Sequence, residues 1–92
     1  FLYEFCTDTG AATYFDATMT AMVDNGWVDD TPAGQDRRRF EAQFTDGVAS
    51  SEFAVHGAYV VETLVDGSVE QDLVALAAVS HDLMSAALER LG

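Results

Sequence analysis

The chain has 92 residues, and its 16 Asp and Glu stand against four Arg and no Lys, which gives a formal net charge of −12. This balance excludes generic binding of DNA or RNA through phosphates, which depends on Lys and Arg, and it disfavours anionic membrane surfaces. The 49% of hydrophobic and 11% of aromatic residues exclude a disordered chain and indicate one folded domain, residues 1–92.

The first predicted element is a helix from Thr9 to Asn25. Three residues that are competent N-caps precede or open it, and apolar residues recur inside it with a period near 3.6. Gly26 suits the left-handed position that ends a helix, and Trp27 is then the apolar residue that packs back on the last turn. This is the best-defined helix boundary of the chain.

The only proline, Pro32, follows Thr31. A Thr-Pro pair is typical of an N-cap followed by the first helical position. It predicts a second helix from Thr31 to about Val48, in which Phe40 and Phe44 lie one turn apart on the same face.

The stretch from Ser50 to Val65 fits either a helix or a strand. Its last seven residues are rich in β-branched side chains, and the turn Asp66-Gly67 follows them, as expected after a strand. A single strand needs a partner, however, and only residues 2–6 offer one. A helix is therefore the preferred interpretation.

The last predicted element is a helix from Ser68 to Leu91. Ser68 and Gln71 have the spacing of a capping box at its start, and Arg90 suits its last turn. The apolar face of this helix is wider than one neighbouring element would cover. It includes Leu76, Leu83, Met84 and Leu88.

These elements together predict an all-α fold, a small helical bundle of three to four helices. The alternative is an α+β fold with a short hairpin from residues 1–6 and 58–65.

Residues with catalytic or metal-binding chemistry are few and far apart. Cys6, His56 and His81 form no paired metal-ligand motif, and the single cysteine can form no internal disulfide. Neither an EF-hand loop nor a glycine-rich phosphate loop is present. We therefore expect no catalytic, cofactor-binding or metal-binding residues, and the sequence favours a protein that is not an enzyme.

Three of the four arginines are consecutive, at Arg37, Arg38 and Arg39. On a helix three consecutive side chains fan across about 200°, so they form no flat patch. Positive charge near a helix N-terminus also gains little from its own helix. We expect a carboxylate elsewhere, in this chain or in a partner, to compensate the run.

The acidic, lysine-free composition is similar to that of cytosolic proteins from salt-loving organisms, in which salt screens the repulsion between carboxylates. The alternative is an acidic domain that arose by chance in a GC-rich genome. The composition and the single cysteine together predict a cytoplasmic protein adapted to high salt, with no signal peptide or membrane span.

The preferred function is a small acidic protein-interaction module that associates with itself or belongs to a larger assembly. Its predicted interaction residues are Arg37, Arg38, Arg39, Leu76, Leu83, Met84 and Leu88. One alternative is a nucleic-acid mimic, such as an inhibitor or antitoxin, whose carboxylates occupy a basic cleft. A second alternative is a helical bundle that binds a small ligand, or a DNA-binding regulator.

Overall fold

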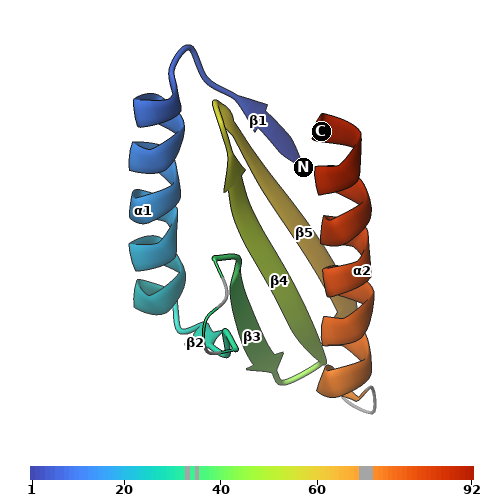
Figure 1. Cartoon of the computed structure of the whole chain (residues 1–92). Coiled ribbons are helices and arrows are strands. Elements are labelled where there is room, and N and C mark those ends of the chain that lie inside the picture. The colour runs from blue at the N-terminus through green and yellow to red at the C-terminus, as the bar shows by residue number, and fades with distance from the viewer. Residues whose placement is uncertain (33, 35, 69–71) are drawn as a thin grey trace.

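The computed structural model describes residues 1–32, 34, 36–68 and 72–92. The elements are β1 (Leu2–Glu4), α1 (Asp8–Asp24), β2 (Val28–Asp29), β3 (Arg38–Phe44), β4 (Gly47–His56), β5 (Tyr59–Gly67) and α2 (Leu73–Leu91). The five strands form one antiparallel sheet in the order β1-β5-β4-β3-β2 (Figure 1). The fold is therefore α+β, and the prediction of an all-α helical bundle is wrong.

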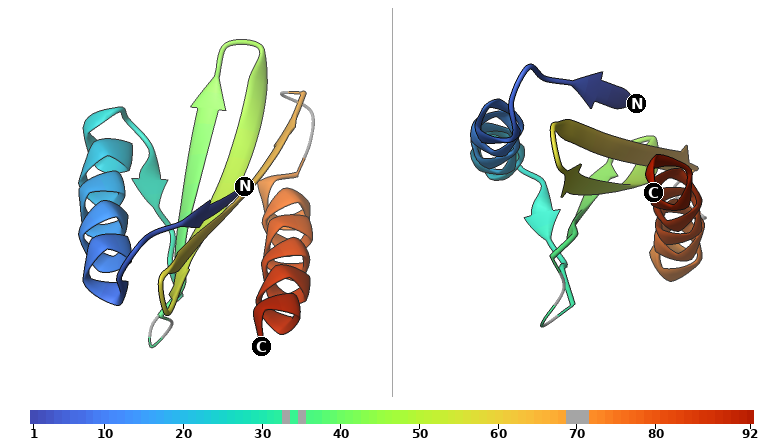
Figure 2. Two further views of the ribbon diagram at one scale, coloured as in Figure 1. Left: turned by 90° about the horizontal axis from the view of Figure 1, so that it is seen from above. Right: turned by 45° about the horizontal axis from the view of Figure 1, so that its top comes forward.

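The two helices cover opposite faces of the sheet (Figure 2). Successive strand residues point to opposite faces, so the cross-strand pairs identify the two sides. Ala54 and Val61 are paired and pack against Met84 of α2. Phe40 belongs to the other face, where it lines a shallow hollow together with Met19 of α1.

Helix α1 begins and ends as the sequence predicts, within one residue. The Thr7 hydroxyl caps it by accepting a hydrogen bond from the Gly10 amide at 2.9 Å. At the other end Gly26 has φ of +90°, and the Trp27 amide donates to the Met22 carbonyl at 3.0 Å. This is the Schellman arrangement, in which the last turn is closed by backbone bonds.

The helix predicted from Thr31 to about Val48 is wrong, because strand β3 and the beginning of β4 occupy this range. Two phenylalanines four residues apart fit a helix turn, but they equally fit alternate positions of a strand. The buried residue between them, Ala42, shows which period applies, since all three lie on one sheet face. A two-residue turn after Phe44 then joins β3 to β4, with Phe44 paired to Gly47.

The helix preferred between Ser50 and Val65 is also wrong. This range contains most of β4 and β5, joined by a tight turn in which Gly57 adopts φ of +58°. The sequence of β4 is misleading because this strand lies in the centre of the sheet. It is buried on both faces and therefore shows no clear alternation of apolar and polar residues. The pairing of residues 1–6 with 58–65 is present, with Leu2 opposite Val61, but as the edge of a five-stranded sheet.

Helix α2 starts later than the predicted Ser68. Its N-cap is Asp72, whose carboxylate accepts a hydrogen bond from the Val74 amide at 2.9 Å. Of the predicted capping box, Gln71 lies outside the described residues. Within the described part of the chain, neither helix is long and apolar enough to cross a membrane.

The core lies between α2 and the sheet. Met84 is fully buried against Ala54 and Val61, and Leu88 packs on the edge of this cluster. Helix α1 contributes one buried residue, Ala11, to the other face. The two layers are therefore unequal, and α2 carries most of the packing.

Replacement of Met84 by alanine is expected to lower the free energy of unfolding by about 3 kcal/mol, because it leaves a cavity in the main core. Val79→Ala is the matched control on the same helix, since Val79 is half exposed. It should change the free energy by less than about 0.5 kcal/mol. Denaturant titration in molar KCl measures both, and equal effects would contradict this account of the core.

Candidate functional site

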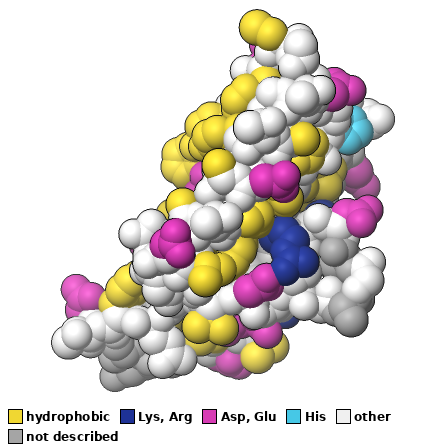
Figure 3. All heavy atoms as spheres, turned by 90° about the vertical axis from the view of Figure 1, so that its left-hand side faces the viewer, with side chains coloured by type: hydrophobic (Ala, Val, Ile, Leu, Met, Phe, Trp, Pro, Cys, Tyr) yellow, Lys and Arg dark blue, Asp and Glu magenta, His cyan; other side chains and the backbone are white. Residues whose placement is uncertain are grey.

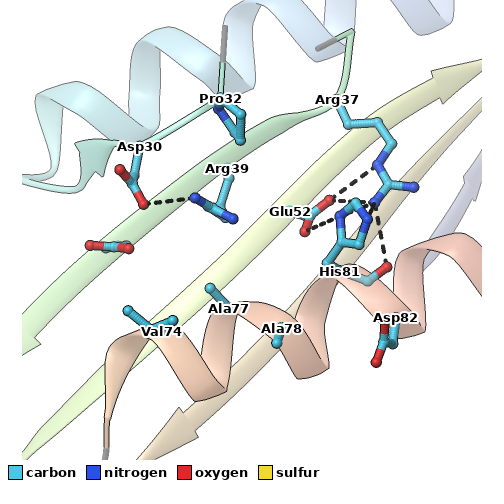
Figure 4. Close-up of a pocket in the computed structure, with 11 residues that line it drawn as sticks. Asp30, Pro32, Arg37, Arg39, Glu52, Val74, Ala77, Ala78, His81 and Asp82 are labelled. Atoms are coloured by element: carbon cyan, nitrogen blue, oxygen red, sulfur yellow. Dashed lines mark hydrogen bonds and ion pairs between the residues drawn. The ribbon is translucent and has the colours of Figure 1, made fainter.

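A charged cavity of about 350 Å³ lies between α2 and strands β3 and β4. The side chains around it come from the segment before β3, from both strands and from the first turns of α2 (Figure 4). Its lining residues are Asp30, Pro32, Arg37, Arg39, Glu41, Glu52, Val74, Ala77, Ala78, His81 and Asp82. We call this space the charged cavity.

Glu52 is the deepest charged residue of the cavity and is only 2% exposed. It sits in the middle of β4 and points to the α2 side of the sheet. Arg37 reaches its Oε1 with Nε at 3.2 Å and with a terminal nitrogen at 3.0 Å. The same guanidinium donates to the Ser85 hydroxyl of α2 at 3.1 Å, so Arg37 connects the start of β3, the central strand and the helix.

His81 completes this cluster from α2. A terminal nitrogen of Arg37 lies against the His81 ring, 3.2 Å from Nε2, and the tautomer of the ring decides which ring nitrogen accepts. His81 Nδ1 also lies 3.3 Å from Glu52 Oε2. Glu52 Oε2 is buried, and the described residues give it no other close partner.

Arg39 and two carboxylates form the other end of the cavity. Arg39 pairs with Asp30 at 3.0 Å, and its Nε is buried without a partner among the described residues. A hydrogen bond with Asp30 and partial burial raise the pKa of Glu41 above its ordinary value. The same hydrogen bond, with help from Arg39, lowers the pKa of Asp30. Of the two carboxyl groups, Glu41 therefore keeps its proton to the higher pH.

The three consecutive arginines each meet a carboxylate of the same chain. Strand geometry sends Arg37 and Arg39 to the α2 side and Arg38 to the other face, where it pairs with Asp29. A compensating carboxylate in the same chain is therefore present for each arginine, which is one of the two alternatives that the sequence left open.

The four apolar residues predicted for interaction lie in different environments. Leu76 and Met84 are buried in the core, and Leu88 is partly buried beside it. Leu83 is 50% exposed and available to a partner. Of the four α2 residues predicted for interaction, Leu83 is therefore the one that is exposed enough to contact a partner.

Glu52 is the cavity residue whose role the sequence did not indicate. It carries no motif in the sequence, and strand β4 directs it under α2 towards His81. Small neighbours on the same strand face, Ser50 and Ala54, were the available indication of close packing. Within the described ranges, no group of three or more His, Cys, Asp and Glu is arranged to hold a metal ion, and Cys6 is exposed.

A second hollow, of about 470 Å³, runs along the β1–β5 edge of the sheet beside the end of α2. We call it the apolar groove. Its lining residues are Phe1, Leu2, Val61, Glu62, Thr63, Leu64, Leu83, Ala87, Arg90 and Leu91. It shares no lining residue with the charged cavity.

Comparison of the chain with known protein families, curated protein sequences and solved structures gives no match.

Loss of one partner of the Glu52–Arg37 pair is expected to destabilise the fold by about 3 kcal/mol, because it leaves the other charge without compensation in a largely buried site. Glu52→Leu and Arg37→Leu test this by denaturant titration. The double variant should cost clearly less than the sum of the single ones. Glu89→Leu, on the exposed side of α2, is the control, and an equally small effect of Glu52→Leu would refute the interpretation.

The hydrogen bond between Glu41 and Asp30 predicts opposite pKa shifts of these two carboxyl groups. In an NMR titration of side-chain carboxyl carbons, Glu41 should lose its proton above its ordinary value of 4.5, and Asp30 below its ordinary value of 3.8. Asp30→Asn should return the pKa of Glu41 towards 4.5, because the carboxylate that raises it is gone. Unchanged titration of Glu41 in that variant would contradict the pairing.

Proposed function

We propose that this chain is a small acidic protein-interaction module, adapted to high salt, that associates with a second copy of itself through the apolar groove. The observation that carries the proposal is the set of large apolar side chains exposed along the groove. Phe1 is 72%, Leu2 56%, Leu83 50% and Leu64 46% exposed. Exposed apolar side chains gathered in one place are typical of an association surface.

The sheet edge in the groove also offers backbone hydrogen bonds. The Glu62 amide donates to the Phe1 carbonyl at 2.9 Å, so the backbone polar groups of Glu62 point away from β4. Those of Leu64 and Asp66 point the same way, because this direction alternates along an antiparallel strand. The pairing of β1 with β5 covers residues 59–61, so a strand of a second copy can pair with the following part of this edge.

Charge favours this surface over the rest of the molecule for contact between two copies. The groove contains one acidic and one basic residue, Glu62 and Arg90, in a chain of formal net charge −12. The other three arginines pair with carboxylates of their own chain. Among the described residues no such pair is found for Arg90, which supports a role in meeting the acidic surface of a second copy.

The distribution of carboxylates supports salt adaptation rather than mimicry of nucleic acid. A mimic needs carboxylates in ordered rows on one face, whereas here they occur on every part of the fold. On the face over α1 they lie singly among apolar and neutral atoms (Figure 3). The exposed ones are Glu4, Asp8, Asp16, Asp24, Asp29, Asp30, Asp36, Asp46, Asp66, Asp72, Asp82 and Glu89.

Sedimentation velocity at several protein concentrations in molar KCl is expected to show a dimer. Leu83→Glu should raise the dissociation constant at least about tenfold, since it adds a carboxylate to the apolar contact of each copy. Val28→Glu is the matched control, because Val28 is 63% exposed on the opposite edge of the sheet, and it should leave the dimer intact.

Dilution of the salt should dissociate the dimer, because repulsion between two acidic copies is then less screened. A wild-type chain that remains monomeric at every concentration and salt level would overturn the proposal. So would equal effects of Leu83→Glu and Val28→Glu.

A further inference from the structure

Another hollow, of about 400 Å³, lies on the α1 side of the sheet, at the turn from β3 to β4. We call it the aromatic hollow. We propose that it binds a quaternary ammonium group, the trimethylammonium head of a small soluble cation such as choline. The lining residues that carry the proposal are Trp27, Phe44, Asp46, Ala49, Leu64 and Asp66.

Two aromatic side chains form adjacent walls of the aromatic hollow. The ring centroids of Trp27 and Phe44 lie 6.2 Å apart, and the ring planes make an angle of 79°. Phe44 is 54% exposed, and its cross-strand partner Gly47 has no side chain to cover it. The face of an aromatic ring attracts a cation, most strongly in Trp. Two rings at nearly a right angle therefore offer electron-rich surface to one cation.

The charges beside the rings select a cation over an anion. Asp46 and Asp66 line the same hollow and are exposed, and none of its described lining residues is an Arg. Asp66 pairs with Ala49 of β4, so its side chain is on the same sheet face as Phe44. Within the described part of the chain neither carboxylate forms an ion pair. Both are therefore available to a cation that contacts the rings.

The apolar part of the lining selects a methylated cation. Ala49 is buried, Leu64 is 46% exposed, and neither side chain has a polar atom. A primary ammonium group loses hydrogen bonds to water on such a surface without replacing them. A trimethylammonium group has no N–H donor to satisfy, so its methyl groups can contact Ala49 and Leu64 while its charge faces the rings.

The proposal does not rest on self-association. The aromatic hollow and the apolar groove share Leu64 alone, and neither the two rings nor the two carboxylates of the hollow line the groove. A variant that no longer associates should therefore keep the complete site.

The test is a titration with choline chloride, followed by tryptophan fluorescence. Trp27 is the only tryptophan of the chain, so its emission reports directly on the aromatic hollow. Choline chloride replaces KCl at a constant molar total, which keeps the ionic strength unchanged. We expect a saturable change of the emission with a Kd of roughly 10 mM for so small and exposed a contact.

Two probes separate the charge of choline from its methyl groups. The neutral alcohol 3,3-dimethylbutan-1-ol has the shape of choline, with carbon in place of nitrogen. Ethanolamine hydrochloride keeps the positive charge but has no methyl group on its nitrogen. Each should bind at least about tenfold more weakly than choline, because each lacks one of the two features that the hollow recognises.

Variants of Phe44 separate the aromatic ring from apolar bulk. Phe44→Leu should raise the Kd for choline at least about tenfold, whereas Phe44→Tyr keeps a ring and should bind within about twofold of the wild type. Phe5→Leu removes an aromatic ring that does not line the hollow and should bind as the wild type does. Joint replacement of Asp46 and Asp66 by asparagine should weaken binding severalfold, because it removes both carboxylates.

The result that overturns the proposal is a wild-type chain whose emission shows no saturable change with choline. Equal affinity for choline and its neutral isostere would overturn it as well, and so would equal affinity of the wild type and Phe44→Leu. Leu83→Glu should bind choline as the wild type does, since Leu83 does not line the aromatic hollow. Loss of choline binding in that variant would overturn a site contained within one chain.

Discussion

The ion pair between Glu52 and Arg37 is the interaction on which the rest of the structure depends. A carboxylate in the middle of a central strand is unfavourable unless a cation accompanies it. Arg37 supplies that cation from the segment just before β3, and another of its nitrogens donates to the Ser85 hydroxyl of α2. The pair therefore fixes where β3 begins and how α2 lies on the sheet, and the space it leaves open is the charged cavity.

The two faces of the sheet are packed to different extents, and this difference shapes the surface. Helix α2 buries Leu76, Ala77, Ser80 and Met84 against the strands, while α1 buries Ala11 alone. A domain of this size has a small core and gains from further burial. The apolar side chains left outside, above all along the β1–β5 edge, are consistent with a chain that completes its packing by association.

The sequence predicted those features of the fold that depend on residues close together along the chain. Helix α1 was predicted almost to the residue, because its cap and its glycine stop act within a single turn. The body of α2 was predicted from its recurring apolar residues, but its start was placed at Ser68, whereas its N-cap is Asp72. The strands were missed because Phe40 and Phe44 satisfy helix and strand spacing alike, and because β4, buried on both faces, has no clear alternation. Their pairing depends on partners far apart along the chain.

The contacts in the charged cavity also depend on residues far apart along the chain, so the sequence alone did not predict them. The arginine run was visible in the sequence, and so was its need for carboxylates. Which carboxylate each arginine meets follows from strand register, which places Arg39 opposite Glu52 and directs Arg38 to the other face. Register is set by the whole sheet. A pairing such as Arg37 with Glu52, fifteen residues apart, therefore becomes predictable only once β3 and β4 are known.

The internal use of arginine also explains how so acidic a chain can fold and still respond to salt. Three of its four positive charges pair with carboxylates of the same chain, and the Arg37–Glu52 pair among them is largely buried, where screening by ions is weak. The carboxylates left over lie mainly at the surface, where mutual repulsion is strong in dilute buffer and screened in concentrated salt. The Arg37–Glu52 pair should therefore persist across salt conditions, whereas contact between two whole molecules depends on the salt concentration. We therefore expect a lower salt concentration to dissociate the copies before it unfolds the chain.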